Sequence, residues 1–420
     1  MIAPPGRLAI TALCVACGAS LPGAGGGGGL PRGQPGPGVA ARVDSAVRSV
    51  MRERDVPGVA IALLRGDSLV LARGYGAAEV ERGTPVTERT VFQLGSTTKP
   101  FTAMAVLLLA DAGRIDLDAR AAAYLPWIRE RYPEVTVRQL LAHTGGAHTD
   151  VRRANVDEIP MAEFRRRFLA APPRSAPGTR WEYSNAGYTL LALIVEAVAG
   201  VSFGVFVESR IFRPLGMADS GYRVPRQQGE SHARGYDWID GAYRPAPHVF
   251  SGWGNSGIES SARDLARWGA ALERGELLSP RSYRLMFGRP ELRAGVPLSF
   301  AFRDDPDASY GLGWFLTRGR GVPVQTHGGA IAGFSSVVTR VPEHRMTIVV
   351  LSNAKDRGDL VGQADVVARA ILDAVLPRAA KTGAATGAEA HSAAPRARGG
   401  RRASGGEARD SPAFTFRRPG

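Results

Sequence analysis

The sequence has only two cysteines, Cys14 and Cys17, and both lie close to its N-terminus. The remainder of the chain therefore has no internal disulfide to stabilise it. After the N-terminal segment there is no uninterrupted apolar run of about 18 residues, which excludes a conventional transmembrane helix there. The seven histidines include no His-x-x-x-His pair and no dense ligand cluster, so we expect no metal site.

Lysine is nearly absent as well, because only Lys99, Lys355 and Lys381 stand among the 53 basic residues. Arginine stays protonated in proteins, whereas a buried lysine can lose its proton and act as a base. Lys99 lies in an otherwise apolar segment. It is therefore the first candidate for a catalytic base.

The net charge of +14 suggests nucleic-acid binding, but the distribution of the charge argues against it. Residues 381–420 hold eight basic and three acidic residues and so contribute +5, and elsewhere the arginines are scattered. Nucleic-acid-binding proteins more typically concentrate this charge in a stripe interleaved with aromatic residues. We therefore expect no nucleic-acid partner. Residues 379–420 are rich in Ala, Gly, Ser and Pro, which predicts a disordered basic tail.

The N-terminus resembles a secretory leader. Arg7 precedes an apolar run, Leu8–Cys17, which is followed by small residues. This run is too short for a stable membrane anchor, so residues 1–22 are predicted to be a signal peptide and residues 23–38 a Gly/Pro linker. We expect a secreted protein, or one in the periplasm or cell envelope. The tripeptide ending at Cys17 faintly resembles a lipoprotein cleavage site, which leaves open a lipid anchor on that residue.

Hydrophobic periodicity predicts strands near both ends of the chain and helices between them. The predicted segments are a helix at 39–54, β-hairpins at 58–75 and 335–352, and a helix at 360–376. We therefore predict an α/β fold of the α+β type, with a mainly antiparallel sheet that is built from both chain ends and flanked by helices. A mostly helical lobe is inserted at about 96–300, and the whole domain spans 39–378.

Ser96 and Lys99 form the first chemical motif, Gly-Ser-Thr-Thr-Lys. Gly95 permits a tight turn, and the apolar run after Lys99 predicts a buried helix whose N-terminal N–H groups favour negative charge near Ser96. Three residues apart, the two side chains share a helix face, which suits proton transfer from hydroxyl to amine. Bringing the pKa of Lys99 near 7 takes about 4 kcal/mol, which burial can supply. The alternative is an N-capping serine beside a lysine that extends to solvent.

Two further motifs follow along the chain. Tyr183-Ser-Asn185 precedes another apolar helix, and His327-Gly-Gly329-Ala330 leads into the second hairpin. The two glycines would let a substrate backbone approach the sheet edge closely. The alternative interpretation of the first motif is a polar loop with Asn185 as a helix cap, and that of the second is a Gly-rich bend with an exposed histidine.

In this order and spacing, the three motifs resemble those of the β-lactamase and penicillin-binding-protein superfamily of serine hydrolases, in the branch of class C β-lactamases, DD-peptidases and related esterases. The resemblance runs from about Val39 to Leu376. It also includes Gln139-Leu-Leu-Ala-His143-Thr-Gly-Gly, which is similar to the LLxHTSG loop of that family. The resemblance implies a β-lactamase/transpeptidase-like fold and a covalent acyl-enzyme formed without a cofactor.

Carried over residue by residue, the resemblance makes Ser96 the nucleophile and leaves open whether Lys99 or Tyr183 accepts its proton. Tyr183 would relay a proton to the leaving group and activate the deacylating water. Asn185 would hold a substrate amide or carbonyl, and the backbone N–H groups of Ser96 and Ala330 would form the oxyanion hole. The implied substrate-binding residues are Asn185, His327, Gly329 and Ala330.

The chain departs from this family at His327, where a β-lactamase of this branch usually carries lysine. Histidine is mostly neutral at pH 7 and cannot serve as a permanent cation for a substrate carboxylate. The departure favours an esterase, an amidase or a D-amino-acid peptidase. Lys381-Thr-Gly383 matches the usual third element of the family literally, but it lies in the predicted tail without a strand pattern.

The sequence therefore predicts a serine acyl hydrolase that acts on esters, amides or D-amino-acid peptides, with a small-molecule or peptide acyl substrate. The alternatives within the family are a penicillin-binding DD-carboxypeptidase and a class C-like β-lactamase. The alternative of another class is a catalytically silent binding or sensory domain on the same fold. The oligomeric state stays open.

Overall fold

The computed structural model describes Leu30 and residues 38–147, 160–222, 231–249, 253–302, 305–358 and 361–376. The predicted signal peptide with Cys17, the predicted basic tail and all of the predicted linker except Leu30 and Gly38 lie outside the described residues.

Nine strands of the described residues form one antiparallel sheet, in the order β3-β2-β1-β14-β13-β12-β11-β10-β9. Their bounds are β1 (Gly58–Arg65), β2 (Ser68–Glu79), β3 (Thr84–Pro85), β9 (Phe300–Phe302), β10 (Asp305–Tyr310), β11 (Phe315–Gly319), β12 (Val322–Ile331), β13 (Phe334–Val341) and β14 (Met346–Ser352). Strand β1 pairs directly with β14. The sheet is therefore built from both ends of the domain, as the sequence predicts.

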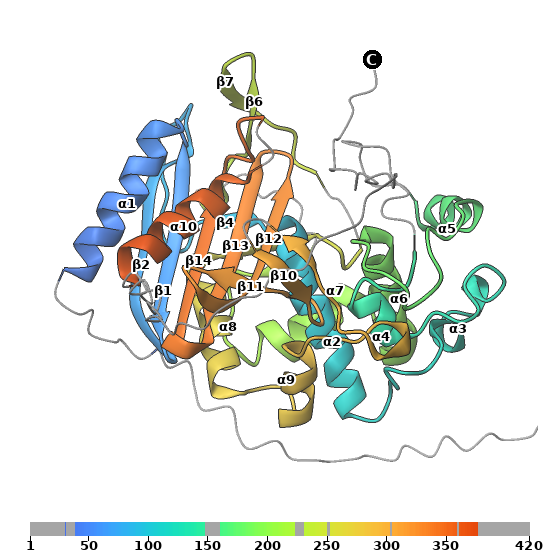
Figure 1. Cartoon of the computed structure of the whole chain (residues 1–420). Coiled ribbons are helices and arrows are strands. Elements are labelled where there is room, and N and C mark those ends of the chain that lie inside the picture. Colours follow the sequence, from blue (N-terminus) through green and yellow to red (C-terminus); the bar gives the residue numbers. More distant parts are fainter. Residues whose placement is uncertain are drawn as a thin grey trace, which may run out of the picture. The chain divides into compact units, whose positions relative to one another are not determined.

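Both faces of this sheet are covered, in agreement with the unbroken apolar run at residues 59–64 of β1. Val59, Ile61 and Leu63 pack on one side, whereas the alternating residues of β1 pack on the other. The first side is covered by α1 (Val39–Glu53) and α10 (Gln363–Val375), which lie next to each other in Figure 1. Helix α8 (Ala262–Arg274) covers the opposite side, against β1 and β14.

The remaining helices lie between the two halves of the sheet in the sequence. They are α2 (Lys99–Asp111), α3 (Ala121–Tyr124), α4 (Val137–Leu141), α5 (Met161–Ala170), α6 (Asn185–Ala199), α7 (Phe203–Val207) and α9 (Pro280–Met286). Helices α2 and α6 pack against each other and are buried along most of their length, because both are apolar on nearly every face. The short turns are the 3-10 helices η1 (Gly95–Thr98), η2 (Pro126–Ile128), η4 (Arg293–Gly295) and η5 (Pro342–His344), with a π-helical turn η3 (Glu208–Phe212).

The segment between residues 96 and 300 is less purely helical than predicted. It contains β5 (Gly221–Tyr222) and β8 (Ile258–Ser261), which form a small second sheet with β4 (Val91–Gln93) in the order β4-β8-β5. It also contains the hairpin of β6 (Tyr236–Ile239) and β7 (Ala242–Pro245). Periodicity misses these strands because each has no more than four residues. The small sheet matters for function, since β4 leads directly into the turn that carries Ser96.

Among the described helices, none alone has the length and apolar composition of a membrane span. One pair of described helices, Asn185–Ala199 and Phe203–Phe212, reaches this length and composition together, and it is bent by 77°.

Candidate active site

Ser96 lies in a tight turn, η1, between the end of β4 and the start of α2. Gly95 has a φ of +53°, and a Cβ added there would lie 3.0 Å from the backbone nitrogen of Ala330. Glycine is therefore needed both for the left-handed backbone and for the close approach of β12. Ser96 itself retains partial exposure, whereas its neighbours in the turn are buried. The turn thus presents one hydroxyl to solvent from a fixed backbone.

The nucleophile turn is attached to the main sheet by side chains that the sequence analysis did not single out. The Thr97 hydroxyl pairs with the hydroxyl of Ser336 at 2.8 Å, and Ser336 also donates to the Leu94 carbonyl at 2.6 Å. A Cβ on Gly329 would lie only 1.9 Å from that same carbonyl. Gly329 therefore lets β12 and the turn pack backbone to backbone.

Lys99 is completely buried, and its ammonium or amine nitrogen has three close partners. Nζ lies 2.9 Å from Ser96 Oγ, 2.8 Å from Asn185 Oδ1 and 2.9 Å from the carbonyl oxygen of Asn255. It also lies 4.7 Å from the centre of the Tyr183 ring. The structure thus brings together Ser96, Lys99, Tyr183 and Asn185 from motifs up to 89 residues apart in the sequence.

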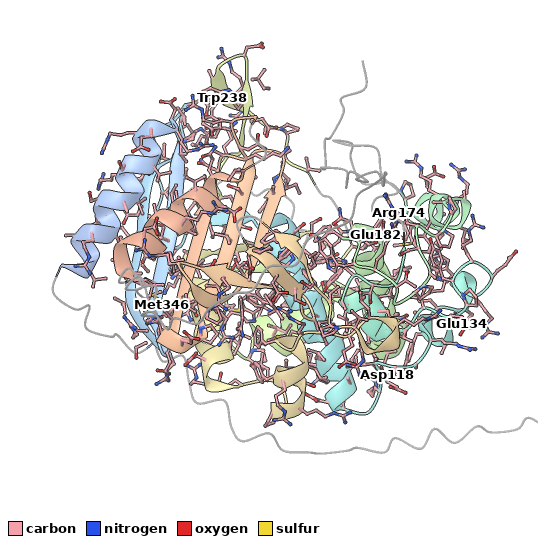
Figure 2. The ribbon with its side chains drawn as sticks, in the orientation of Figure 1. Asp118, Glu134, Arg174, Glu182, Trp238 and Met346 are labelled. Atoms are coloured by element: carbon pink, nitrogen blue, oxygen red, sulfur yellow. The ribbon has the colours of Figure 1, made fainter. Side chains whose placement is uncertain are left out.

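Tyr183 approaches Ser96 from the loop before α6. Burial raises the pKa of the Tyr183 phenol well above its usual value, and a hydrogen bond with Ser96 opposes this increase. The phenol is therefore protonated at neutral pH. The preceding residue, Glu182, is held by Arg174 at 3.2 Å and Arg180 at 2.7 Å, and Figure 2 shows Arg174 beside Glu182. After the loop, Ser184 caps α6 by accepting from the Gly187 N–H at 2.9 Å, which fixes Asn185 in the first turn of that helix.

His327 is buried, and both of its ring nitrogens have partners. Nδ1 lies 2.8 Å from the carbonyl oxygen of Gly328, which can only accept, so Nδ1 carries the proton. Nε2 then accepts from the Tyr310 hydroxyl at 3.0 Å. Burial lowers the pKa of His327 to about 3, although the hydrogen bond to the Gly328 carbonyl raises it. His327 is therefore neutral, and its predicted contact with substrate stays a prediction.

Three residues near the site carried no prediction of a catalytic contact. Asn255 acts through its carbonyl oxygen, which every residue possesses, so its identity gives no signal. Tyr310 and Tyr188 are fully buried beside the site. Buried aromatic residues are typical of any protein core, so their residue type gives no signal either. Tyr310 differs from an ordinary core tyrosine in that its hydroxyl pairs with His327. The sequence gives no sign of this contact, because it depends on the order of the strands in the sheet.

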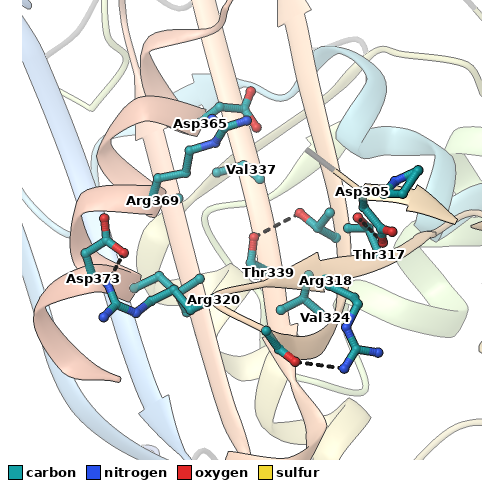
Figure 3. Close-up of a pocket in the computed structure, with 16 residues that line it drawn as sticks. Asp305, Thr317, Arg318, Arg320, Val324, Val337, Thr339, Asp365, Arg369 and Asp373 are labelled. Carbon is teal, nitrogen blue, oxygen red and sulfur yellow. Dashed lines mark hydrogen bonds and ion pairs between the residues drawn. The ribbon is translucent and has the colours of Figure 1, made fainter. Parts of the chain in front are cut away.

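Figure 3 shows a separate cavity of about 540 Å³ between α10 and strands β11 to β13. It includes none of the predicted site residues. Its charged side chains are partly paired with one another, as in Arg320 with Asp373, and the Thr326 and Thr339 hydroxyls pair at 2.9 Å. No group of three or more His, Cys, Asp or Glu side chains that could hold a metal occurs in the described part of the chain. The candidate active site is the one at Ser96, because the structure brings Lys99, Tyr183 and Asn185 together there.

Comparison with known proteins identifies the family of the chain. Residues 43–372 match the family model for Beta-lactamase. Protein flp of Staphylococcus aureus (strain COL) is 25% identical over 324 residues, which cover 74% of this chain and 62% of that protein. Penicillin-binding protein 4* of Bacillus subtilis (strain 168) is 27% identical over 326 residues, which cover 71% of this chain and 68% of that protein. The chain thus spans less than two thirds of the length of protein flp.

Solved structures give the same result for the fold. The octameric penicillin-binding protein homologue from Pyrococcus abyssi superposes with a TM-score of 0.69 at 26% identity, covering 79% of this chain and 76% of that one. A penicillin binding protein from Bacillus halodurans gives a TM-score of 0.66 at 26% identity, covering 79% of this chain and 99% of that one. The chain belongs to the Beta-lactamase family, and with it to the serine hydrolase superfamily.

Proposed function

We propose that the protein is a serine acyl hydrolase that cleaves uncharged, apolar esters through a covalent intermediate on Ser96. One observation carries the proposal: the buried Lys99 nitrogen lies 2.9 Å from Ser96 Oγ. A neutral amine has two N–H donors, and the Asn185 side chain and the Asn255 carbonyl can accept both. The lone pair of the amine is then left for the Ser96 proton, which makes Lys99 the base of acylation.

Acylation in this proposal moves two protons. Ser96 Oγ bonds to the ester carbonyl carbon while its proton passes to Lys99, and the backbone N–H groups of Ser96 and Ala330 stabilise the resulting oxyanion. The protonated phenol of Tyr183 then donates to the departing alkoxide, and the carbon–oxygen bond to the leaving group breaks. The products of this step are the free alcohol, the Ser96 ester, a Lys99 ammonium and a Tyr183 phenolate.

Deacylation returns both protons. A water molecule attacks the acyl carbon while the Tyr183 phenolate takes one of its protons, which restores the phenol. The Lys99 ammonium returns its proton to Ser96 Oγ as the acyl–oxygen bond breaks. The ammonium lies close to the Tyr183 ring, at 4.7 Å, so its charge favours the phenolate that this step requires.

The charge of the site supports an uncharged substrate. A substrate carboxylate beside His327 would find a buried neutral ring whose nitrogens are already paired with Tyr310 and Gly328. Placing an anion there would cost its hydration without a cationic partner. An ester without a carboxylate avoids this cost, and this difference favours esterase activity over the cleavage of peptides that end in a carboxylate.

Aromatic side chains beside Tyr183 support an apolar substituent on that ester. The Trp181 ring stacks on Phe300 at 4.0 Å, and Phe302 stacks on Phe315 at 4.2 Å. Phe315 in turn lies parallel to the Tyr183 ring at 6.5 Å. Trp181, Phe300 and Phe302 keep partial exposure. Covering these rings with an apolar group would gain roughly 25 cal/mol for each Å² removed from water.

A matched pair of substrates tests the proposal. We expect the full chain to hydrolyse p-nitrophenyl butyrate with a kcat/KM at least about 10-fold above that for mono-p-nitrophenyl glutarate, which adds a carboxylate to a similar chain. Ser96→Ala should abolish both activities above the background rate. Faster hydrolysis of the glutarate ester, of a D-alanyl-D-alanine peptide or of a β-lactam would contradict the proposed substrate class while leaving the nucleophile intact.

A further inference from the structure

His143 holds both backbone neighbours of Tyr183. Its carbonyl oxygen accepts from the Glu182 N–H at 2.8 Å, and its ring nitrogen Nδ1 accepts from the Ser184 N–H at 3.1 Å. One residue therefore fixes the chain immediately before and immediately after the phenol that meets Ser96.

The ring of His143 also packs against the ring of Tyr183. The two ring centres lie 4.5 Å apart, and His143 lies at similar distances, 4.8 and 4.7 Å, from Tyr188 and Tyr310. The side chain is 2% exposed, and the backbone of His143 has a φ of +58°. A left-handed backbone is unfavourable for a residue with a Cβ, so the surrounding contacts must hold it there.

The protonation of the ring shows which of its atoms is needed. Because Nδ1 accepts a backbone hydrogen bond, the proton of the neutral ring stands on Nε2. Nε2 is buried, and it has no hydrogen-bond partner within the part of the chain that the structure describes. Burial lowers the pKa of His143 well below its usual value, so the ring stays neutral. A phenylalanine would fill the same space without an unpaired donor, so the distinctive contribution of histidine is the acceptor at Nδ1.

We infer that His143 is a positioning residue, which sets the Tyr183 hydroxyl against Ser96 by accepting the Ser184 N–H and supporting the phenol ring. The inference rests on the proposed function, in which Tyr183 transfers the proton to the leaving group.

Two substitutions separate the acceptor from the ring. In His143→Asn the Oδ1 atom occupies the place of Nδ1, and asparagine tolerates the left-handed backbone. In His143→Phe the ring remains and the acceptor is lost. We expect His143→Phe to lower kcat by about 10- to 100-fold with KM changed less than about 3-fold, because a small displacement of a catalytic group costs rate rather than binding. His143→Asn should keep kcat within about 5-fold of the wild type.

A second measurement needs no turnover and reads the position of Tyr183 directly. Hydrogen exchange at the Ser184 amide should accelerate in His143→Phe and stay protected in His143→Asn, and crystals of His143→Phe should show the phenol moved away from Ser96. Wild-type kcat in a folded His143→Phe, or a phenol still bonded to Ser96 in its crystals, would overturn the inference. If the wild-type enzyme itself fails to cleave esters, the proposed function fails, whereas the exchange and crystal results still decide the role of His143.

Discussion

Glu259 provides a test of the electrostatics beside the nucleophile turn. Glu259 lies on β8 and is 3% exposed. Its partner in the sheet is Gln93 of β4, and Gln93 precedes Ser96 by three residues. Its carboxylate accepts from the Gln93 amide at 3.1 Å, and the rings of His248 and His232 lie 3.4 and 3.7 Å away. Burial raises the pKa of Glu259 from 4.5 to about 7, although the bond from Gln93 lowers it.

The sign of the resulting pH dependence follows from proton binding. Between pH 4.5 and about 7 the folded protein holds the Glu259 proton more tightly than the unfolded chain does. The stabilisation by this proton is complete below pH 4.5 and is lost as the pH rises through about 7. The difference between the pKa of Glu259 in the unfolded chain, 4.5, and in the folded protein, about 7, corresponds to about 3 kcal/mol in the free energy of unfolding. Protonated His232 or His248 would favour the carboxylate and reduce this value.

The variant Glu259→Gln removes the titrating proton and keeps the shape of the side chain. We expect the wild type to lose about 2 to 3 kcal/mol of stability relative to Glu259→Gln between about pH 5 and pH 8, measured by urea unfolding at each pH. Glu134→Gln, whose exposed side chain is labelled in Figure 2, is the matched surface control. Parallel stability curves for the wild type and Glu259→Gln, or a difference that grows in the opposite direction, would refute the reasoning.

Three further substitutions test individual contacts. Tyr183→Phe should lower kcat by about 10²- to 10⁴-fold in ester hydrolysis because it removes the proton donor, and near-normal kcat would contradict that role. Gly329→Ala should destabilise the fold by about 1–3 kcal/mol or more in urea unfolding, since its Cβ would overlap the Leu94 carbonyl; an unchanged midpoint would show that β12 can withdraw. Tyr310→Phe leaves the buried Nε2 of His327 without a donor and should cost about 1–3 kcal/mol of stability, whereas an unaffected variant would imply a substitute donor.

The parts of the fold that the sequence predicts are those whose pattern is local. The continuous apolar run at residues 59–64 of β1 identifies a strand buried on both faces, and the matching run in β14 identifies its partner near the other chain end. Strands β9 and β10 carry no such pattern, because β9 has three residues and β10 includes Asp305 and Asp307. Pairing with neighbours, rather than local sequence, determines their conformation.

In the candidate site, too, local relations can be predicted from the sequence, whereas contacts between distant strands cannot. Ser96 and Lys99 are related by one helical turn, so their spacing alone predicts that the two side chains meet. The neutrality of His327 depends on burial and on Tyr310, which reaches it from another strand of the sheet. The residue type suggests a neutral ring at pH 7, but only the assembled sheet shows that both nitrogens are occupied.

The central claim is that Ser96 is the nucleophile, and covalent labelling tests it most directly. The full chain is incubated with a fluorophosphonate probe and examined by intact-protein mass spectrometry, next to Ser96→Ala shown to be folded by circular dichroism. We expect a single adduct on the wild type, located on the peptide that contains Ser96, and none on Ser96→Ala. An equal adduct on Ser96→Ala, or no adduct on folded wild-type protein, would contradict the claim and favour a catalytically silent binding domain on the same fold.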